Sequence, residues 1–339
     1  MTSTQEDDTM EPRKSDDQPT IADVAELAGV SRAIASRALS SEPRPVSADK
    51  RERVLQAAHQ LGYKPNLLAR SLTTKTVNLV AVVVNHIHDL SDLDLFDLLI
   101  SEIQSIGKQV IFVRVGSADR IEEFLRNGIA YHVDAALVFS DFADAATVRR
   151  MFRNDRVLML NGMRDADAPA IIPDELSGIA AAVADAAGKG VRTATLVTGR
   201  SASPVEQTRI AHYKSEMRRH GIELIAELRG DYSYQSGRAL AASSAWRNAE
   251  AVFCTSDAMA MGVLDVHRDA LSGDARAFRL YGFDDVTLAE YEAYPISSIG
   301  YDKTVYIKEI LQFLTAPDRF QSGGVLVQVP TYFVPRSSS

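Results

Sequence analysis

The chain of 339 residues contains one cysteine, Cys254, so no disulfide can form within it. Such scarcity of cysteine is typical of proteins in reducing compartments. No stretch reaches the about 18 apolar residues that span a bilayer. The start of the chain, residues 1–18, is acidic and polar, and it lacks the basic and apolar segments of a secretory signal. We therefore expect a soluble protein of the cytoplasm with no membrane partner.

Motifs of enzymes are also missing. The sequence contains neither a phosphate-cradling P-loop nor a GxSxG nucleophile elbow, and Gly188-Lys189-Gly190 has the surroundings of neither. His86 and His88 lie close together, but no cysteine or third histidine is near them in sequence. We expect no enzymatic activity, no cofactor and no metal site.

The charge is unevenly distributed along the chain, whose net charge is −8. Residues 19–76 hold nine basic and five acidic side chains, whereas residues 1–18 hold two basic and six acidic ones. The remainder, residues 77–339, is acidic. A small basic module on a larger acidic body is typical of a DNA-binding headpiece joined to a sensing domain. We interpret the acidic tail, residues 1–18, as disordered.

The basic module has the pattern of short helices separated by turn residues. Thr20 and Asp23 have the spacing of a capping box, and Gly29 is placed to end that helix. Ser31 can cap a second helix at residues 32–39, and Ser47 a third at residues 48–61. Two helices joined by so tight a turn predict a helix-turn-helix. The pattern alone leaves a DNA-binding and a protein–protein domain equally open. The expected core is Val24, Ala28, Val30, Ala35 and Leu39.

Specific residues distinguish these alternatives. The informative segments are Thr20 to Ser31 (TIADVAELAGVS), Ser36-Arg37, Val46-Ser47, Arg51 to Leu55 (RERVL), Leu61 to Asn66 (LGYKPN) and Ala69 to Leu72 (ARSL). In order and spacing they resemble the headpiece of the lactose-repressor (LacI) family of transcription regulators. The resemblance implies a helix-turn-helix domain at residues 19–64 and a hinge helix with linker at residues 65–76.

The resemblance also implies roles in DNA binding. The second helix would enter the major groove, where Arg32 can pair with guanine and Ala33 can offer a methyl to thymine. The hinge helix would lie in the minor groove, with Leu72 as the apolar wedge, Ala69 keeping the helix thin and Asn66 on a phosphate. The positions matching DNA contacts are Thr20, Ser31, Arg32, Ala33, Ser36, Arg37, Asn66, Ala69 and Leu72.

Some headpiece positions remain open to other interpretations. Leu72 could instead cover the edge of the next domain, and Arg70 and Lys75 could belong to a solvated linker. Ile34 and Ala35 depart from the threonine and valine that the family often has there. These departures affect the expected operator sequence and leave the expectation of DNA binding in place.

The body, residues 77–339, alternates apolar runs with helical patterns. Near-continuous apolar runs such as residues 77–84 are typical of strands buried on both faces of a parallel sheet. Further strands are expected at residues 109–115, 135–139, 157–160, 194–197, 222–228, 251–254 and 279–283. Helices are expected at residues 94–106, 120–127, 145–152, 176–189, 205–219, 236–246 and 258–270. The alternation predicts an α/β fold, and the length suits two doubly wound parallel-sheet lobes.

Ligands of such sheets bind beyond the carboxyl ends of the strands. That rule singles out loop residues including Asn85, Asp89, Ser203 and Ser256. The body also resembles the periplasmic-binding-protein-like sensor of the same family, in Thr255 to Gly262 (TSDAMAMG) and Gly282 to Asp285 (GFDD). By this resemblance Arg209 would bind hydroxyls or a carboxylate, and Tyr232 would stack on a ring face. The expected effector contacts are Asn85, Asp89, Arg209, Tyr232, Ser256, Asp257, Asp284 and Tyr301.

Several body residues have structural alternatives. Asp257 can serve equally as the cap of the helix that follows it, and Asp174 suits a cap or turn better than a ligand contact. The lone tryptophan, Trp246, suits packing better than stacking. His86 to Leu95 lacks the aromatic pair common in the family, and His212 replaces a glycine, so the first lobe's side of the cleft is not predictable.

We therefore predict a DNA-binding transcriptional regulator, a repressor, controlled by a sugar or glycoside. It would bind a pseudo-palindromic operator as a homodimer and associate with the nucleoid. Two alternatives are an exported solute-binding protein with the same body and a corepressor-type regulator that senses a non-sugar metabolite. An enzyme with an incidental helical domain is disfavoured by the missing catalytic groups.

Overall fold

The computed structural model describes residues 19–40, 45–63, 77–87, 89–126, 132–163, 165–201, 203–242, 248–268, 278–320 and 324–339. These residues form two compact units divided between Val77 and Asn78, each considered by itself below. The expectations for the acidic tail, for Asn66, Ala69 and Leu72 of the hinge, and for His88 and Trp246 lie outside the described residues. Among the described residues, no helix combines the length and the apolar character that crossing a bilayer requires.

The first unit contains α1 (Ile21–Leu27), α2 (Arg32–Ala38) and α3 (Ala48–Leu61). The Thr20 backbone donates to the Asp23 carboxylate at 2.8 Å and the Asp23 backbone to the Thr20 hydroxyl at 3.5 Å, which confirms the capping box. Gly29 has φ +62°, as a glycine ending a helix requires. Its core is formed by Val24, Ala25, Ala28, Ala35, Ala38, Val54, Ala57 and Ala58, with Val30 and Leu39 packed against it.

Two arginines of α3 fasten the three helices together. The Arg53 guanidinium donates to the Ala28 carbonyl and that of Arg51 to the Ala38 carbonyl, each at 3.2 Å. These carbonyls belong to the C-terminal ends of α1 and α2, where intrahelical partners run out. Part of the basic charge of this module therefore has a structural use. Ser47 occupies the N-cap position of α3, but its side chain makes no capping hydrogen bond, contrary to the expectation.

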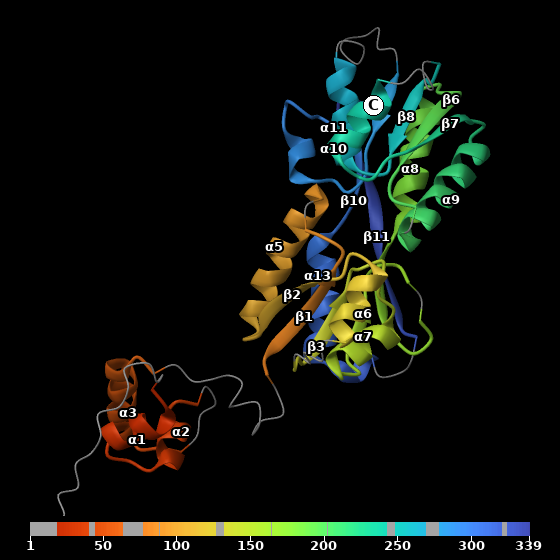
Figure 1. Ribbon diagram of the computed structural model, residues 1–339. Helices are drawn as coiled ribbons and strands as arrows, with labels where there is room; N and C mark the ends of the chain where they lie inside the picture. Colours follow the sequence, from red (N-terminus) through yellow and green to blue (C-terminus); the bar gives the residue numbers. More distant parts are fainter. Residues whose placement is uncertain are drawn as a thin grey trace, which may run out of the picture. The chain divides into compact units, whose positions relative to one another are not determined.

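The second unit is built on two sheets (Figure 1). The first sheet has seven strands among the described residues, in the order β10-β11-β5-β4-β3-β1-β2. They are β1 (Leu79–Val84), β2 (Gln109–Arg114), β3 (Ala135–Val138), β4 (Val157–Met159), β5 (Ala170–Asp174), β10 (Ser298–Tyr301) and β11 (Leu326–Val334). All pairs are parallel except β10 with β11. The expected purely parallel lobe therefore needs a correction, because the chain returns along β11 beside β10.

The second sheet has four parallel strands among the described residues, in the order β7-β6-β8-β9. They are β6 (Thr193–Thr198), β7 (Glu223–Arg229), β8 (Ala251–Cys254) and β9 (Arg279–Tyr281). Both sheets begin with the doubly wound order second-first-third-fourth. Each consequently has a switch point where the strand order reverses, beyond β1 and β3 in one lobe and beyond β6 and β8 in the other.

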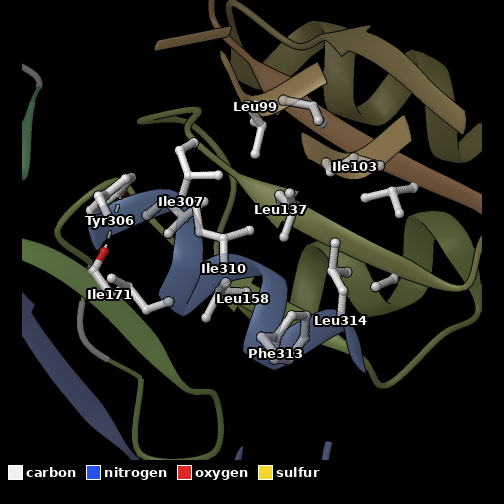
Figure 2. Packing of buried hydrophobic residues seen from close by; sticks show 14 of the residues in the cluster. Leu99, Ile103, Leu137, Leu158, Ile171, Tyr306, Ile307, Ile310, Phe313 and Leu314 are labelled. Atoms are coloured by element: carbon white, nitrogen blue, oxygen red, sulfur yellow. Dashed lines mark hydrogen bonds between the residues drawn. The ribbon is translucent and has the colours of Figure 1, made fainter. Parts of the chain in front are cut away.

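Helices cover both faces of each sheet. In the first lobe, α5 (Leu90–Ser105) and α13 (Lys303–Thr315) share one face, and α6 (Ala118–Arg126) and α7 (Ala145–Phe152) cover the other. Figure 2 shows Ile310 and Phe313 of α13 packed over Leu158 of β4. Each fully buried side chain of this kind contributes about 1.5–3 kcal/mol to folding. A short helix, η2 (Pro317–Phe320), follows α13 and adds Phe320 to this core.

The second lobe repeats the arrangement. Its two cores hold α8 (Glu175–Gly188) and α9 (Pro204–Arg219) on one face and α10 (Tyr234–Ala241) and α11 (Asp257–Val266) on the other. A short helix, η1 (Thr287–Glu290), follows β9 and contributes Ala289 to the second core. Cys254 is buried within this lobe, and burial raises the pKa of its thiol far above the ordinary range.

The strand β11 belongs to both lobes. Its first half pairs with β5, where Val329 lies opposite Pro173 and Pro330 opposite Asp174, and its second half pairs with β10. Figure 1 shows β10 and β11 running between the lobes. Neither β5, β10, β11 nor α13 was predicted from the sequence. The strands β5 and β11 each contain a proline, which is rare inside strands. The helix α13 was missed because the Thr304 to Ile307 stretch near its start is rich in β-branched and aromatic residues, which favour helices less.

The contact of α8 with the crossing strands predicts the effect of one methyl group. A Cβ on Gly178 would lie 2.4 Å from Ile299 Cγ2 and 2.7 Å from Thr331 Oγ1. We expect Gly178→Ala to lower the free energy of unfolding of the body by about 1–3 kcal/mol, the usual cost of overpacking. Gly188→Ala is the matched control, because a Cβ at this end of the same helix meets nothing within 4 Å. Denaturant unfolding followed by circular dichroism compares the two, and equal effects would contradict this account.

Candidate functional site

A cavity of about 170 Å³ lies between the two lobes. The first lobe contributes residues beyond β1, and the second contributes residues beyond β6, β7, β8 and β9 and the start of α9. The cavity therefore sits where the switch points of the two sheets face each other. Its walls are Asp89, Leu90, Ser91, Arg200, Ser203, Val205, Arg209, Tyr232, Ser256, Ala258, Asp284 and Val286.

Arg209 is the central cation of the second lobe's wall. It donates to both oxygens of Glu175, at 2.6 and 3.1 Å, and to the Thr255 carbonyl at 2.7 Å. Its guanidinium carbon lies 3.7 Å from the centroid of the Phe283 ring. Burial opposes the charge, but the Glu175 carboxylate outweighs it and raises the pKa of Arg209. A bidentate pair of this kind fixes the orientation of the guanidinium fork.

Glu206 connects Arg209 to Tyr232. Its buried carboxylate accepts the Tyr232 hydroxyl and the Thr255 hydroxyl, each at 2.8 Å, and also the Gly199 backbone. Tyr232 has φ +72° and lies so close to Gly199 that a Cβ there would be 1.9 Å from the ring. The tyrosine is therefore held from its hydroxyl end and along its edge, and burial raises the pKa of its hydroxyl.

Arg200 and Asp89 join the two lobes directly. Arg200 Nη2 lies 2.7 Å from Asp89 Oδ2, and its Nη1 donates to the Asp231 carbonyl at 3.0 Å. The guanidinium carbon is 4.6 Å from the centroid of the Tyr232 ring. Burial alone would raise the pKa of Asp89, but the hydrogen bonds of Arg200 and His86 outweigh it and lower the pKa.

Three side chains beside the cavity have atoms that could bind a metal ion within 4.8 Å of one another: His86, Asp89 and Asp92. The spacing of the histidines in the sequence did not predict this group. His86 Nε2 lies 2.9 Å from Asp89 Oδ2, and the Asp92 carboxylate accepts the Asp89 backbone at 3.3 Å. The same Asp89 oxygen holds the Arg200 cation. Both carboxylates thus already serve the start of α5 and the lobe contact.

The two neighbouring acids, Asp257 and Asp284, have different surroundings. Asp257 is fully buried and accepts the Ser298 hydroxyl at 2.6 Å and the Val286 backbone at 2.9 Å. Burial raises its pKa to about 7, and the nearby Asp285 charge adds to the rise. Asp284 lines the cavity with φ +101°. Burial also raises the pKa of Asp284, although Arg209 opposes the rise.

Five of the eight predicted effector residues lie in the cavity wall: Asp89, Arg209, Tyr232, Ser256 and Asp284. The Ser256 hydroxyl also caps α11 by accepting the Met259 backbone at 3.3 Å. Whether any of the five contacts a ligand remains a prediction.

The other three residues lie outside the cavity wall formed by the described residues. Asn85 instead orders a neighbouring loop, donating to Asp141 at 2.8 Å and accepting the Ser140 hydroxyl at 2.7 Å. Asp257 is the first residue of α11 and connects this helix with β10, whereas Ser256 is the N-cap, so the alternative that Asp257 caps the helix is wrong. Tyr301 packs edge-on against Tyr306, with ring centroids 5.4 Å apart.

Sequence reasoning missed Arg200 and most of the apolar wall. Arg200 follows β6 at its carboxyl end, so the strand-end rule could have identified it. Leu90, Ser91, Val205, Ala258 and Val286 lie in the first turns of helices or in the loop after β9. Their place in the wall depends on the approach of the two lobes, which local sequence does not specify.

The first unit presents the predicted recognition face of α2. Arg32, Ala33, Ser36 and Arg37 are exposed, whereas Ala35 and Ala38 on the opposite side are buried. Within the described residues of this unit, neither Arg32 nor Arg37 is recorded in an ion pair. Thr20 and Ser31 are exposed caps whose hydroxyls accept backbone amides. The roles of these six residues in DNA binding remain predictions.

The raised pKa of Asp257 predicts a pH-dependent stability. Its folded-state pKa of about 7 exceeds its ordinary value of 3.8, so the folded state holds a proton that the unfolded state releases. This contribution to stability is therefore complete in acid and is lost as the pH rises from about 4 to 7. We expect Asp257→Asn to gain about 1.4 kcal/mol of stability relative to the parent chain for each pH unit from pH 5 to about pH 7, and little more up to pH 8. Thermal unfolding at pH 5 and pH 8 measures this, and a constant difference would contradict it.

The buried ion pair predicts a large effect of removing Arg209. Arg209→Ala would leave the Glu175 and Glu206 carboxylates buried without their cation, so we expect a loss of about 3–5 kcal/mol in folding stability. Arg120→Ala is the control, because its 2.9 Å pair with Glu123 is exposed to solvent and should change stability by less than about 1 kcal/mol. Denaturant unfolding measures both, and similar losses would show that the buried pair has no special role.

Comparison with known proteins agrees with these two units. The family model of bacterial regulatory proteins of the lacI family matches residues 20–66. The model of a periplasmic binding protein-like domain matches residues 183–339. The transcriptional regulator AscG of Escherichia coli is 27% identical over 302 residues, covering 86% of this chain and 90% of its own.

Solved structures share the fold. The Lac repressor dimer bound to operator and the anti-inducer ONPF matches with a TM-score of 0.81 and 23% identity, over 95% of this chain and 99% of that one. The complex of the transcriptional regulator CelR with cellobiose matches with a TM-score of 0.66 and 22% identity, over 95% and 100%. The headpiece motifs, the body and their order in the chain all agree with those of lacI-family regulators, and the headpiece matches the model of the lacI family of bacterial regulatory proteins.

Proposed function

We propose that the chain is a transcriptional repressor whose affinity for operator DNA is set by a small ligand bound between the lobes of its body. The observation that carries this proposal is a polar cavity between two sheet switch points, in the same chain as a helix-turn-helix with a basic exposed face. A solute-binding protein would need such a cavity but has no use for the helix-turn-helix. The lacI-family relatives are regulators rather than enzymes.

DNA recognition would use the exposed face of α2. Arg32 can make two parallel hydrogen bonds to guanine, and the Ala33 methyl can contact the methyl of thymine. Ser31, Ser36 and Arg37 would position the helix on the backbone, with Thr20 at the start of α1. Asn66, Ala69 and Leu72 would supply the minor-groove contacts of a hinge helix. DNA binding places the working protein in the cytoplasm, associated with the nucleoid.

A homodimer suits this mode of binding. A two-fold symmetric pair of headpieces matches a pseudo-palindromic operator, and two paired hinge helices fill one stretch of minor groove. The Lac repressor relative is described as a dimer bound to its operator, which supports the same assembly here. Ligand closing or opening the cleft would then alter the spacing of the two hinge helices. A typical coupling of about 1–3 kcal/mol changes operator affinity about 5- to 150-fold.

The cavity suits a polyhydroxylated ligand. Carboxylates, guanidinium groups and serine hydroxyls converge on a small volume between apolar wall residues. A sugar or glycoside offers donors for Asp89 and Asp284 and acceptors for Arg209. The CelR relative is described with cellobiose, which supports a sugar for this chain. A corepressor-type regulator that senses a non-sugar metabolite is the alternative.

The recognition role of Arg32 gives the direct test. An operator is first obtained by selecting binding sites from random duplex DNA with the full chain. We expect Arg32→Ala to weaken binding to that site by about 1–3 kcal/mol and to relax the preference at one base pair of each half-site. Fluorescence anisotropy with the selected and substituted duplexes measures both effects.

Arg153→Ala serves as the control, because this arginine lies at the end of α7 in the body. It should leave DNA binding unchanged. If no sequence is enriched in the selection, the proposed function fails. If Arg32→Ala binds with unchanged affinity and preference, the assignment of α2 as the recognition helix fails.

A further inference from the structure

We propose that Arg200 determines which ligands the cleft accepts, because its bond to Asp89 closes the lobes over a cavity of single-ring size. This inference rests on the proposed function, since it concerns the ligand site of the regulator. Arg200 follows β6 in the second lobe and Asp89 precedes α5 in the first. Both side chains line the cavity, so their 2.7 Å contact is part of the wall that a ligand meets.

Arg200 is held in place from three sides. Its guanidinium contacts the Asp89 carboxylate across the cleft, the Asp231 carbonyl in its own lobe and the ring of Tyr232 at 4.6 Å. On the far side, His86 contacts the same Asp89 oxygen at 2.9 Å and so fixes the acceptor. A planar, preorganised guanidinium loses less entropy on forming such contacts than a lysine would.

This arrangement changes what Tyr232 can offer a ligand. An aromatic side chain in a sugar site ordinarily presents a free ring face for stacking. Here Arg200 covers a face of Tyr232, and Gly199 and Glu206 hold its edge and hydroxyl. The cation thus occupies a ring face on which a sugar could otherwise stack, and it supplies hydrogen-bond donors to the cavity wall.

Other lobe contacts flank the cavity. The Asp94 carboxylate of α5 accepts the Thr287 backbone and hydroxyl of η1 at 3.0 and 3.1 Å. Near the start of α9, Val205 packs so closely on Gly162 that a Cβ there would be 2.4 Å away. The cavity volume of about 170 Å³ is below the about 300 Å³ at which pockets for larger organic ligands begin. A volume of this size suits one furanose or pyranose ring, and we expect two linked rings to need a wider cleft.

The first experiment measures lobe closure without ligand. Asp119→Cys on α6 and Ser215→Cys on α9 place exposed labels on the two lobes. The native Cys254 is buried and does not compete for label. Energy transfer is recorded in the full chain, mixed with excess unlabelled chain so that transfer is within one molecule. Arg200→Ser and Asp89→Asn each remove one partner, and asparagine still suits the N-cap of α5.

We expect each single variant to shift the transfer efficiency and the double variant to shift it no further, because both act through one contact. Arg120→Ser, which breaks an exposed pair within α6, is the control and should leave the efficiency unchanged. Unchanged efficiency in the Arg200→Ser and Asp89→Asn variants, or additive shifts in the double variant, would overturn the proposal.

The second experiment measures ligand size by thermal shift with D-ribose, D-glucose, cellobiose and maltose. We expect only single-ring sugars to raise the unfolding temperature of the parent chain, and Arg200→Ser to respond to a disaccharide as well. A disaccharide that raises the unfolding temperature of the parent chain overturns the size limit. If none of the four sugars raises the unfolding temperature of the parent chain or of Arg200→Ser, the proposal that the ligand is a sugar fails. The energy-transfer experiment alone then upholds or overturns the role of Arg200.

Discussion

The second lobe is organised around the burial of one positive charge between two negative ones. Arg209 on α9 is fastened to Glu175 at the start of α8, to the Thr255 carbonyl beyond β8 and to the face of Phe283 beyond β9. Glu206, one turn earlier on α9, extends the network to Tyr232. A buried charge is tolerated only where its partners are complete, so these elements have to meet at one point. The cavity wall is the outer surface of that network.

The cavity itself is a product of topology. Each sheet has a reversal of strand order, and each reversal leaves a crevice beyond the carboxyl ends of its strands. The chain crosses from β5 to α8, returns through β10 and crosses once more along β11, and the two crevices face one another. The ligand site therefore draws its residues from loops far apart in sequence. The short loops after β1 and β6 supply Asp89 and Arg200, which meet across the gap.

Local chemistry could be predicted from the sequence, and features that depend on distant contacts could not. The Thr20–Asp23 cap and the turn at Gly29 depend on neighbouring residues only, and the structure confirms both. Apolar runs located the central strands, whereas β5 and β11 escaped because each contains a proline. The strand-end rule and the family resemblance brought five residues to the cavity. Asn85 and Asp257 lie outside the cavity wall formed by the described residues, because their polar atoms bind other parts of the protein. Arg200 stands where the strand-end rule applies, but its pairing with Asp89 of the other lobe could not be read from local sequence.

The two prolines at the lobe crossing have a mechanical consequence. Pro173 on β5 and Pro330 on β11 lie one register step apart on adjacent strands. Neither can donate a backbone hydrogen bond, and each has its φ torsion fixed by its ring. The β-ladder thus has fewer backbone hydrogen-bond donors where the chain passes between the lobes, while rotation about two of its φ torsions is restricted. Because the two φ torsions are fixed, a movement of one lobe relative to the other would have to use the torsions beside these prolines.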